Sequence, residues 1–291
     1  MSPAPDVQRG VAFRDGVAAL KKAGVESPAL DAAVLLGYVT GELPATVLLN
    51  RESTLKPSET ELYSALVQKR CGRVAVSRLV GAREFYSRNF HVTNAVLDPR
   101  PETEILVEQA ISCLENLDGS LSVLDIGTGS GAIAVTVAAQ IPQARVTATD
   151  ISMPALAVAR RNAACHLVLE RVNFIQADLF DGIRGEGYFQ VILSNPPYIP
   201  RAQFDSLQEE VRQGDPMVSL VSGPDGTEFY PPLAEHSLGL LCAGGSLMVE
   251  VGAGQGGVVA GVFHQAGYAD VQIVNDLAGI DRVVKGKKKN A

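Results

Sequence analysis

The sequence predicts an α/β protein, in which a doubly wound parallel sheet of about seven strands follows a small helical bundle and a β-hairpin connector. Three observations favour this fold class. Short apolar, β-branched runs alternate with helical patterns from residue 121 to residue 285, as they do in βαβ units. A glycine-rich turn follows the first of these runs, and residues 6–73 show only helical periodicity. With 291 residues, the chain is long enough for about two domains.

Residues 1–75 are predicted to form a helical domain. Apolar residues recur at helical spacing in four stretches, and Gly24 and Pro28 separate the first two. The segment contains no reactive cluster and is too small for chemistry of its own, so we expect it to recognise the substrate. In residues 76–95 polar and apolar residues alternate, starting with residues 76–80, which predicts a β-hairpin connector.

Residues 96–285 are expected to form the α/β domain. Its predicted strands, in chain order, are residues 123–126, 145–150, 172–177, 191–193, 246–251, 271–274 and 282–284. Because the carboxyl ends of parallel strands meet at one edge of an open sheet, we expect the ligand site at that edge. The lysine-rich residues 286–291 are predicted to be a basic, disordered tail.

A glycine-rich loop links the first strand of this domain to the helix that follows. It consists of Gly127, Thr128, Gly129, Ser130 and Gly131, and glycines allow a tight turn and a close approach of the backbone to a ligand. Alone the loop is weak evidence, because dehydrogenases hold a pyrophosphate on a similar G-x-G-x-x-G pattern. It predicts a nucleotide-like cofactor without identifying it.

Residues at the ends of the next two strands favour a nucleoside. Asp150 lies 23 residues after Gly127, where a carboxylate can accept hydrogen bonds from both hydroxyls of a ribose. Asp178 and Leu179 end the third strand, within reach of the edge and face of an adenine. NAD and S-adenosylmethionine both contain such a ribose, so these residues do not choose between them.

The fourth strand is followed by Asn195, Pro196, Pro197 and Tyr198. Prolines lack a backbone N–H and fix φ near about −65°, so the carbonyls of this turn can point outward unpaired. Asn195 Oδ1 and a neighbouring carbonyl can then accept both hydrogens of a planar NH₂ group, while Tyr198 covers one face. The simpler interpretation is an Asn-Pro turn after a buried strand. Beside a cofactor loop, the amide cradle favours methyl transfer to nitrogen, because it has no role in hydride transfer.

Composition excludes several classes of protein. No apolar run approaches the length of a membrane span, and the first residues show no signal-peptide pattern. The four cysteines are scattered without a C-x-x-C pair and the four histidines are isolated, so neither a disulfide framework nor a metal site is expected. We therefore expect a reduced, cytoplasmic protein.

Charge is unevenly distributed along the chain. Residues 1–95 have a net charge of +3, from 12 basic and 9 acidic residues, whereas residues 96–291 have a net charge of −10, from 13 and 23. A large nucleic-acid interface normally needs a basic face. The acidic α/β half therefore argues against a direct nucleic-acid partner.

A proline- and glutamate-rich segment, residues 99–104, precedes the glycine loop and has the sequence Pro-Arg-Pro-Glu-Thr-Glu. Pro101 suits the first position of a helix, and Glu102 and Glu104 lie favourably near the positive end of the helix dipole. From its physical chemistry alone, the segment predicts a well-started helix and nothing more.

Taken together, these motifs resemble the PrmC/HemK family, methyltransferases that modify the glutamine of the Gly-Gly-Gln motif in class I peptide-chain release factors. The resemblance covers essentially the full length, from the helical domain through the glycine loop, Asp150 and the Asn-Pro-Pro-Tyr motif. Asn-Pro-Pro-Tyr is shared with methyltransferases of DNA adenine, RNA guanine and ribosomal-protein glutamine. The hexapeptide at residues 99–104 is much more specific to the release-factor branch.

The resemblance implies a Rossmann-like domain that uses S-adenosylmethionine, with a release factor as partner, no metal, and a monomeric state. The implied cofactor-binding residues are Gly127, Thr128, Gly129, Ser130, Gly131, Asp150, Asp178, Leu179 and Asn195. The implied glutamine-binding residues are Asn195, Pro196, Pro197 and Tyr198, of which Asn195, Pro196 and Tyr198 are also the implied catalytic residues.

Two other interpretations stay open. A related enzyme acting on a ribosomal-protein glutamine or a nucleic-acid base would share the Asn-Pro-Pro-Tyr motif, and an NAD-binding module would share the glycine loop. The chain also departs from the family pattern at Ala75, Ser87, Asp98 and Leu179. These positions lie in the connector and beside the adenine, so the departures bear on affinity more than on activity.

Overall fold

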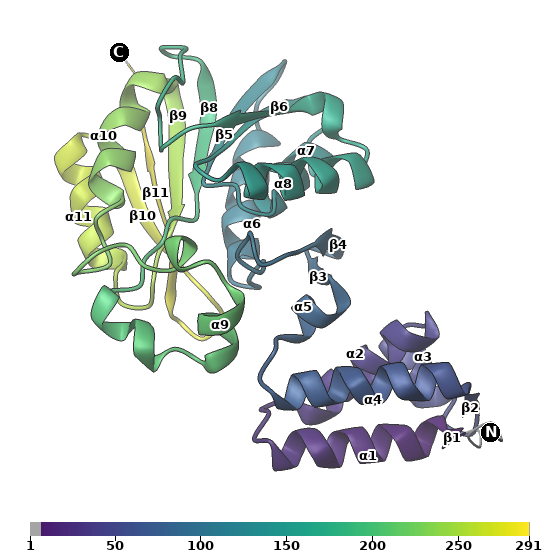
Figure 1. Ribbon diagram of the computed structural model, residues 1–291. Coiled ribbons are helices and arrows are strands. Elements are labelled where there is room, and N and C mark those ends of the chain that lie inside the picture. The colour runs from purple at the N-terminus through teal and green to yellow at the C-terminus, as the bar shows by residue number, and fades with distance from the viewer. Residues whose placement is uncertain (1–6, 291) are drawn as a thin grey trace. The chain divides into compact units, whose positions relative to one another are not determined.

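The computed structural model describes residues 7–290, so the expectations for residues 1–6 and for Ala291 lie outside it. The chain forms two compact units (Figure 1). The helical unit contains the residues up to Ala82 together with the later segment Gln208–Gly214. The α/β unit contains Arg83–Leu207 and the chain from Asp215 onwards.

The helical unit has the four helices that the sequence predicts. They are α1 (Arg9–Lys22), α2 (Pro28–Thr40), α3 (Pro44–Leu49) and α4 (Pro57–Cys71). A short antiparallel pair, β1 (Val7–Gln8) and β2 (Thr54–Leu55), accompanies them. Leucines from three of these segments are fully buried in a separate core, namely Leu20, Leu35, Leu36 and Leu55.

The prediction of a strand at residues 76–80 is wrong, because these residues form a helix, α5 (Val76–Val80). Val76, Leu79 and Val80 all pack against the core of the helical unit, and their i, i+3, i+4 spacing is helical. Gly81, with φ +69°, ends this helix in the left-handed conformation. The alternation of polar and apolar residues was therefore misleading over so short a segment.

A segment that follows the Asn-Pro-Pro-Tyr motif in sequence belongs to the helical unit. It includes the helix α9 (Glu209–Gly214). Arg70 of α4 is 8% exposed and donates to Asp31 Oδ2 and to Glu210 Oε1, each at 2.7 Å. Burial opposes the charge of Glu210, but the hydrogen bond from Arg70 and the positive charges of Arg70 and Arg73 together lower the pKa of that carboxyl. Arg70 therefore binds α9 into the helical unit through paired, desolvated charges.

The hairpin of the connector is shorter than predicted and consists of β3 (Ala82–Phe85) and β4 (Arg88–His91). Its two turn residues, Tyr86 and Ser87, have φ values of +51° and +56°, as in a two-residue type I′ turn. The Tyr86 N–H donates to Glu104 Oε1 at 2.8 Å. The hairpin turn is thus held by a glutamate of the hexapeptide at residues 99–104.

The central sheet has seven strands, as the sequence predicts, in the order β10-β11-β9-β8-β5-β6-β7. The strands are β5 (Leu121–Ile126), β6 (Ala144–Asp150), β7 (Val172–Gln176), β8 (Phe189–Ser194), β9 (Leu241–Glu250), β10 (Ala269–Asn275) and β11 (Asp281–Lys287). β5 pairs in parallel with β6 and β8, whereas β11 runs antiparallel to β9 and β10. The carboxyl ends of β5 to β8 therefore share one edge.

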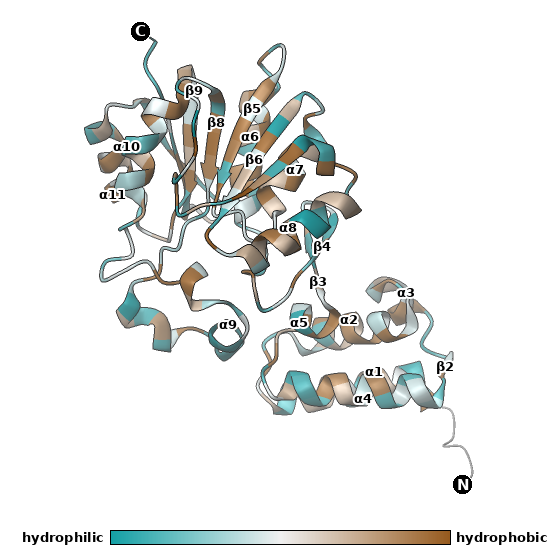
Figure 2. Cartoon of the chain, turned by 45° about the horizontal axis from the view of Figure 1, so that its top comes forward, coloured by the Kyte–Doolittle hydropathy of each residue, from teal (hydrophilic) through white to brown (hydrophobic). Residues whose placement is uncertain are grey.

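Helices cover both faces of this sheet (Figure 1). On one face α6 (Thr103–Leu114), α7 (Ala132–Gln140) and α8 (Met153–Cys165) share a hydrophobic core with Val191 and Leu193 of β8. On the other, α10 (Tyr230–Leu240) and α11 (Gly256–Ala266) share a second core with Ile192. Because both sides of the strand are buried, β8 and β5 are apolar along most of their length (Figure 2).

The prediction of a disordered tail from residue 286 is wrong for residues 286–288. Lys287 is still part of β11 and pairs with Ser246 of β9. The Lys288 N–H donates to the Gly245 carbonyl at 2.8 Å, and Lys288 Nζ donates to the Leu241 carbonyl at 2.7 Å. Backbone pairing with β9 orders these residues, while the exposed Lys287 side chain stays in solvent.

We predict that Ser87→Gly stabilises the α/β unit. Ser87 is exposed and has φ +56°, a conformation that costs a residue with a Cβ roughly 1–2 kcal/mol. Glycine removes this cost but gains entropy in the unfolded chain, so the net gain is about 0.5–1 kcal/mol. The melting temperature should rise by roughly 1–3 °C. Ser87→Ala, the matched control, keeps the Cβ and should not stabilise; an equal rise in both variants would contradict this account.

Candidate active site

A cavity of about 370 Å³ lies at the carboxyl edge of the sheet. It is lined by residues that follow β5, β6, β7 and β8, together with the segment that leads into α6. Ten of the predicted site residues line it: Gly127, Thr128, Gly129, Ser130, Asp150, Asp178, Leu179, Asn195, Pro196 and Pro197. The structure thus brings the cofactor loop and the amide cradle to one cavity. Gly131 and Tyr198 are not among the residues that line it.

The glycine loop presents its backbone to the cavity. Gly127 has φ +74° and Gly129 has φ +55°, and a Cβ built on either would point into open space. Gly131, with φ +80°, plays a different part, because a Cβ there would lie 3.0 Å from the Cβ of Ala159. Gly127 and Gly129 therefore shape the surface for a ligand, whereas Gly131 allows α7 and α8 to pack closely.

Asp150, at the end of β6, turns its carboxylate towards the same cavity. Its Oδ2 accepts from the Gly129 N–H and its Oδ1 from the Ser152 N–H, both at 2.9 Å. Burial raises the pKa of Asp150 above its usual range, although these two hydrogen bonds oppose the shift. Each oxygen has capacity for a second hydrogen bond, so the carboxylate fits the paired hydroxyls of a ribose.

Asp125 is a structural residue of the site to which sequence reasoning gave no role. It is fully buried at the end of β5, and its Oδ2 accepts from Thr128 Oγ1 at 2.6 Å and from the Ala134 N–H at 3.2 Å. Burial raises the pKa of Asp125 to about 7, against the effect of both hydrogen bonds. The signal in the sequence was an acidic residue within an apolar strand, shortly before a glycine loop, which could have predicted that Asp125 binds the loop.

Asn162 of α8 was also missed. It is 1% exposed, and its Nδ2 donates to the carbonyls of Ser130 and His91, at 2.8 and 2.9 Å. Its Oδ1 accepts from the His91 N–H at 2.8 Å. One buried amide therefore ties the glycine loop to the hairpin strand β4. Asn162 lies within a helical pattern of the sequence, and nothing in that pattern indicates partners so far away in the chain.

Leu179 lines the cavity in a strained conformation. Its φ of +49° lies in the left-handed region, which costs a leucine roughly 1–2 kcal/mol. The side chain also packs beside the core between the sheet and α10. Together with the exposed Asp178 it offers an apolar surface next to a hydrogen-bond acceptor, which suits the face and edge of an adenine.

The Asn-Pro-Pro-Tyr turn is anchored at both of its ends. Asn195 Nδ2 donates to Thr103 Oγ1 at 3.1 Å. The Tyr198 carbonyl accepts from Gln255 Nε2 at 3.0 Å, and burial raises the pKa of the Tyr198 phenol, which keeps it neutral. Within residues 7–290, the Pro196 carbonyl accepts no hydrogen bond from the chain. The turn is thus held rigidly while this acceptor remains available to a ligand.

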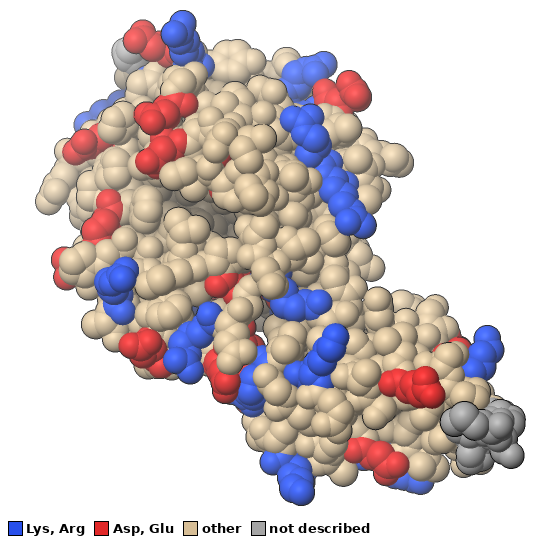
Figure 3. Space-filling model, viewed as in Figure 1, with Lys and Arg blue, Asp and Glu red and all other residues tan. Residues whose placement is uncertain are grey.

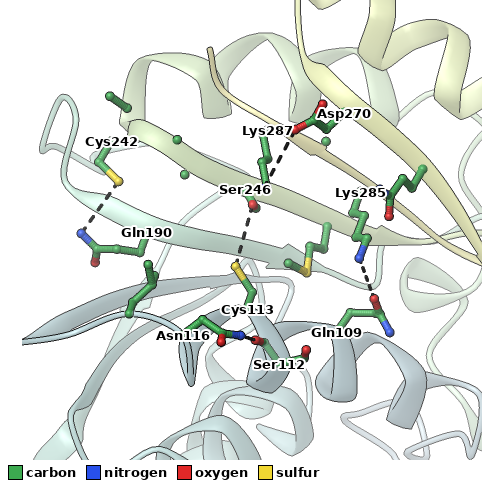
Figure 4. A pocket seen from close by; sticks show the side chains of 17 residues that line it. Gln109, Ser112, Cys113, Asn116, Gln190, Cys242, Ser246, Asp270, Lys285 and Lys287 are labelled. Carbon is green, nitrogen blue, oxygen red and sulfur yellow. Dashed lines mark hydrogen bonds and ion pairs between the residues drawn. The ribbon is translucent and has the colours of Figure 1, made fainter. Parts of the chain in front are cut away.

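A second cavity, of about 390 Å³, lies near the amino ends of β8 and β9 (Figure 4). Polar groups that line it are paired with one another: Lys285 Nζ donates to Gln109 Oε1 at 2.8 Å, and Gln190 Nε2 donates to Cys242 Sγ at 3.9 Å. Neither the glycine loop nor the Asn-Pro-Pro-Tyr turn reaches it. The candidate active site is therefore the cavity at the carboxyl edge.

Among residues 7–290, no group of three or more histidine, cysteine, aspartate and glutamate residues has an arrangement that could hold a metal ion. In the same part of the chain, no helix combines the length and apolar character needed to cross a membrane.

The sheet order and this site define the class of S-adenosylmethionine-dependent methyltransferases. Residues 103–213 match the family model described as Methyltransferase small domain. A crystal structure of a methyltransferase from Pyrococcus furiosus is similar in fold, with a TM-score of 0.53 at 19% identity, covering 76% of this chain and 99% of that one.

Residues 12–81 match the PrmC N-terminal domain. A release factor glutamine methyltransferase of Rhodopirellula baltica is 41% identical over 275 residues, which are 92% of each chain. One from Neisseria gonorrhoeae is 42% identical over 262 residues, 89% of this chain and 93% of the relative. The chain therefore belongs to the release factor glutamine methyltransferase family, as its motifs suggested, and S-adenosylmethionine is its methyl donor.

We predict that Asp150→Ala lowers the affinity for S-adenosylmethionine at least tenfold. If Asp150 binds the ribose, the substitution removes charge-assisted hydrogen bonds, each worth about 1.5–3 kcal/mol. Isothermal titration calorimetry measures the affinity, and a thermal melt checks the fold, because the Gly129 and Ser152 N–H groups also lose their acceptor. Asp181→Ala, an exposed acid in the loop after β7, is the control and should bind normally. Unchanged affinity of Asp150→Ala would remove this residue from the site.

Proposed function

We propose that this protein transfers a methyl group from S-adenosylmethionine to the side-chain amide nitrogen of the glutamine in the Gly-Gly-Gln motif of class I peptide-chain release factors. The observation that supports this most directly is the position of Asn195 and Pro196, which line the same cavity as the glycine loop and Asp150. Membership of the release factor glutamine methyltransferase family points to the same substrate.

An amide nitrogen is a weak nucleophile, because its lone pair is delocalised into the carbonyl. Hydrogen bonds from its NH₂ group to Asn195 Oδ1 and to the Pro196 carbonyl orient the nitrogen and increase its electron density. S-adenosylmethionine supplies an electrophilic methyl group on a sulfonium. The nitrogen gains a bond to the methyl carbon, the carbon–sulfur electron pair stays on sulfur, and one N–H proton leaves. Orientation of this kind can contribute roughly 7–11 kcal/mol.

We assign no general base. Once methylated, the amide nitrogen is strongly acidic and loses its proton readily to water or to an acceptor already in place. Tyr198 covers one face of the amide in this proposal, and its neutral phenol is not needed as a base. The rate enhancement then comes from placement of the amide rather than from proton abstraction.

We assign docking of the release factor to the helical unit. It contains the match to the PrmC N-terminal domain, and it has a hydrophobic core of its own. It also includes α9, which follows the Asn-Pro-Pro-Tyr turn in sequence and is bound by Arg70. The segment Gln208–Gly214 is therefore part of the unit to which we assign docking.

An enzyme that modifies nucleic-acid bases is the less supported alternative. The α/β half has a net charge of −10, and Figure 3 shows acidic and basic side chains interspersed over most of the visible face, with one short basic row. The face in view has no broad basic groove of the kind that a duplex requires. We accordingly propose that the macromolecular partner of this enzyme is a protein.

Methyl transfer to a panel of substrates tests the function. The protein is incubated with labelled S-adenosylmethionine and a class I release factor, a ribosomal protein or DNA, and the product is located by mass spectrometry. We expect one methyl group on the Gly-Gly-Gln glutamine of the release factor. A release factor with that glutamine replaced by alanine is the control. Methylation of that control, or of the ribosomal protein or DNA instead, would contradict the proposal.

We predict that turnover falls in the order wild type, Asn195→Asp, Asn195→Ala. Alanine removes the side-chain acceptor, and loss of one preorganised polar contact lowers the rate by about 10²–10³-fold. Aspartate keeps an oxygen acceptor of the same size and should retain part of the activity. Affinity for S-adenosylmethionine, measured by calorimetry, should change much less in both variants. Wild-type turnover by Asn195→Ala would show that the amide cradle is misassigned.

A further inference from the structure

A chain of three polar side chains runs from the cavity into the protein interior. Asn195 lines the cavity, Thr103 stands at the first position of α6, and Glu250 ends β9. Asn195 Nδ2 donates to Thr103 Oγ1 at 3.1 Å, and Thr103 Oγ1 donates to Glu250 Oε2 at 2.5 Å. Thr103 is 4% exposed and Glu250 is 2% exposed. Water has little access to these two side chains, so they form their hydrogen bonds with protein groups rather than with solvent.

The number of hydrogens that each side chain can donate determines the direction of these hydrogen bonds. A threonine hydroxyl has one hydrogen and two acceptor sites. Since Thr103 donates that hydrogen to Glu250, its Oγ1 can only accept from Asn195. An asparagine that faces an acceptor-only oxygen must present its Nδ2 there and its Oδ1 to the opposite side. The opposite orientation of the amide would bring two acceptors, Oδ1 and Oγ1, into contact.

The environment of Glu250 favours its role as an acceptor. Burial raises the pKa of its carboxyl to about 7, while the hydrogen bond from Thr103 and the charge of Arg282 oppose the shift and the charge of Glu102 adds to it. The Glu250 carbonyl also lies 3.2 Å from the hydroxyl of the buried Tyr230, which anchors the end of β9. In mildly alkaline solution the Glu250 carboxyl is ionised and can only accept hydrogen bonds, whereas the protonated form could also donate one.

We propose that Thr103 and Glu250 are positioning residues that select the amide orientation of Asn195, so that Oδ1 rather than Nδ2 faces the glutamine to be methylated. This inference rests on the proposed function, because the amide orientation matters only if Asn195 accepts a hydrogen bond from the substrate. An Asn195 amide turned the other way would place an NH₂ group against the NH₂ group of the glutamine. The threonine of the hexapeptide at residues 99–104 thereby gains a role beyond the start of a helix.

Kinetics of Thr103 variants at pH 8.5 test the proposal. Thr103→Val has almost the same shape but no hydroxyl, so kcat on the release factor should fall about 10–100-fold, as for loss of other groups that orient a functional side chain. Affinity for S-adenosylmethionine should change less than about twofold, and Thr103→Ser, which keeps the hydroxyl, should restore most of kcat. The control is Thr136→Val, a buried threonine of α7 that does not line the cavity; its kcat should match the wild type.

A double-mutant cycle with Asn195→Asp distinguishes orientation from general support of the fold. Both side-chain oxygens of an aspartate accept hydrogen bonds, so there is no amide orientation left to select. Thr103→Val should then cost less than about threefold in kcat, although it costs about 10–100-fold when Asn195 is present. An equal cost in both backgrounds would overturn the proposal, because the hydroxyl would act by another route. Thermal melts of all variants exclude simple unfolding.

The outcomes separate this inference from the function on which it rests. If the wild-type protein does not methylate the release factor, the proposed function fails. If the wild type is active and Thr103→Val has unchanged kcat, only the positioning role is wrong. A fall in kcat that Thr103→Ser does not restore, while the melting temperature is unchanged, would also contradict the selection of the amide orientation by a hydroxyl.

Discussion

Buried and half-buried carboxylates near the carboxyl ends of three strands are the constraint on which the site depends. Asp125 lies next to the last residue of β5, Asp150 ends β6 and Glu250 ends β9. Asp150 lines the cavity, and the other two accept hydrogen bonds from Thr128 and Thr103, which also line it. Burial raises the pKa of each carboxyl, and backbone N–H or hydroxyl groups donate to all three. A desolvated acid tolerates little loss of its donors, so the segments that supply them are held in place.

Buried side chains hold the loops that line the cavity in place. Two buried side chains hold the glycine loop: Asp125 accepts a hydrogen bond from Thr128, and Asn162 donates one to the Ser130 carbonyl. Thr103 and Gln255 hold the two ends of the Asn-Pro-Pro-Tyr turn. Groups that face the cavity are therefore positioned by a layer of buried polar residues, which is the arrangement expected when orientation supplies most of the rate enhancement.

Much of the fold followed from local patterns. Seven strands were predicted near their observed positions, because buried parallel strands are short apolar runs separated by turn residues and helices. The errors lie where a local pattern was ambiguous. Residues 76–80 alternate like a strand but bury Val76, Leu79 and Val80 on one helical face. Residues 286–288 are rich in lysine, yet their backbone completes the pairing of β11 with β9.

The sequence by itself determined the chemistry of the site: a glycine loop, an acid after the next strand and an amide followed by two prolines are local motifs whose spacing is written in the chain. Only the tertiary structure decided which groups hold them. Thr103 and Asn195 are 92 residues apart, and Thr103 and Glu250 are 147 apart. Pairings over such distances depend on how the strands and helices pack, because a hydroxyl or carboxylate has no partner in the sequence until folding brings one within about 3 Å.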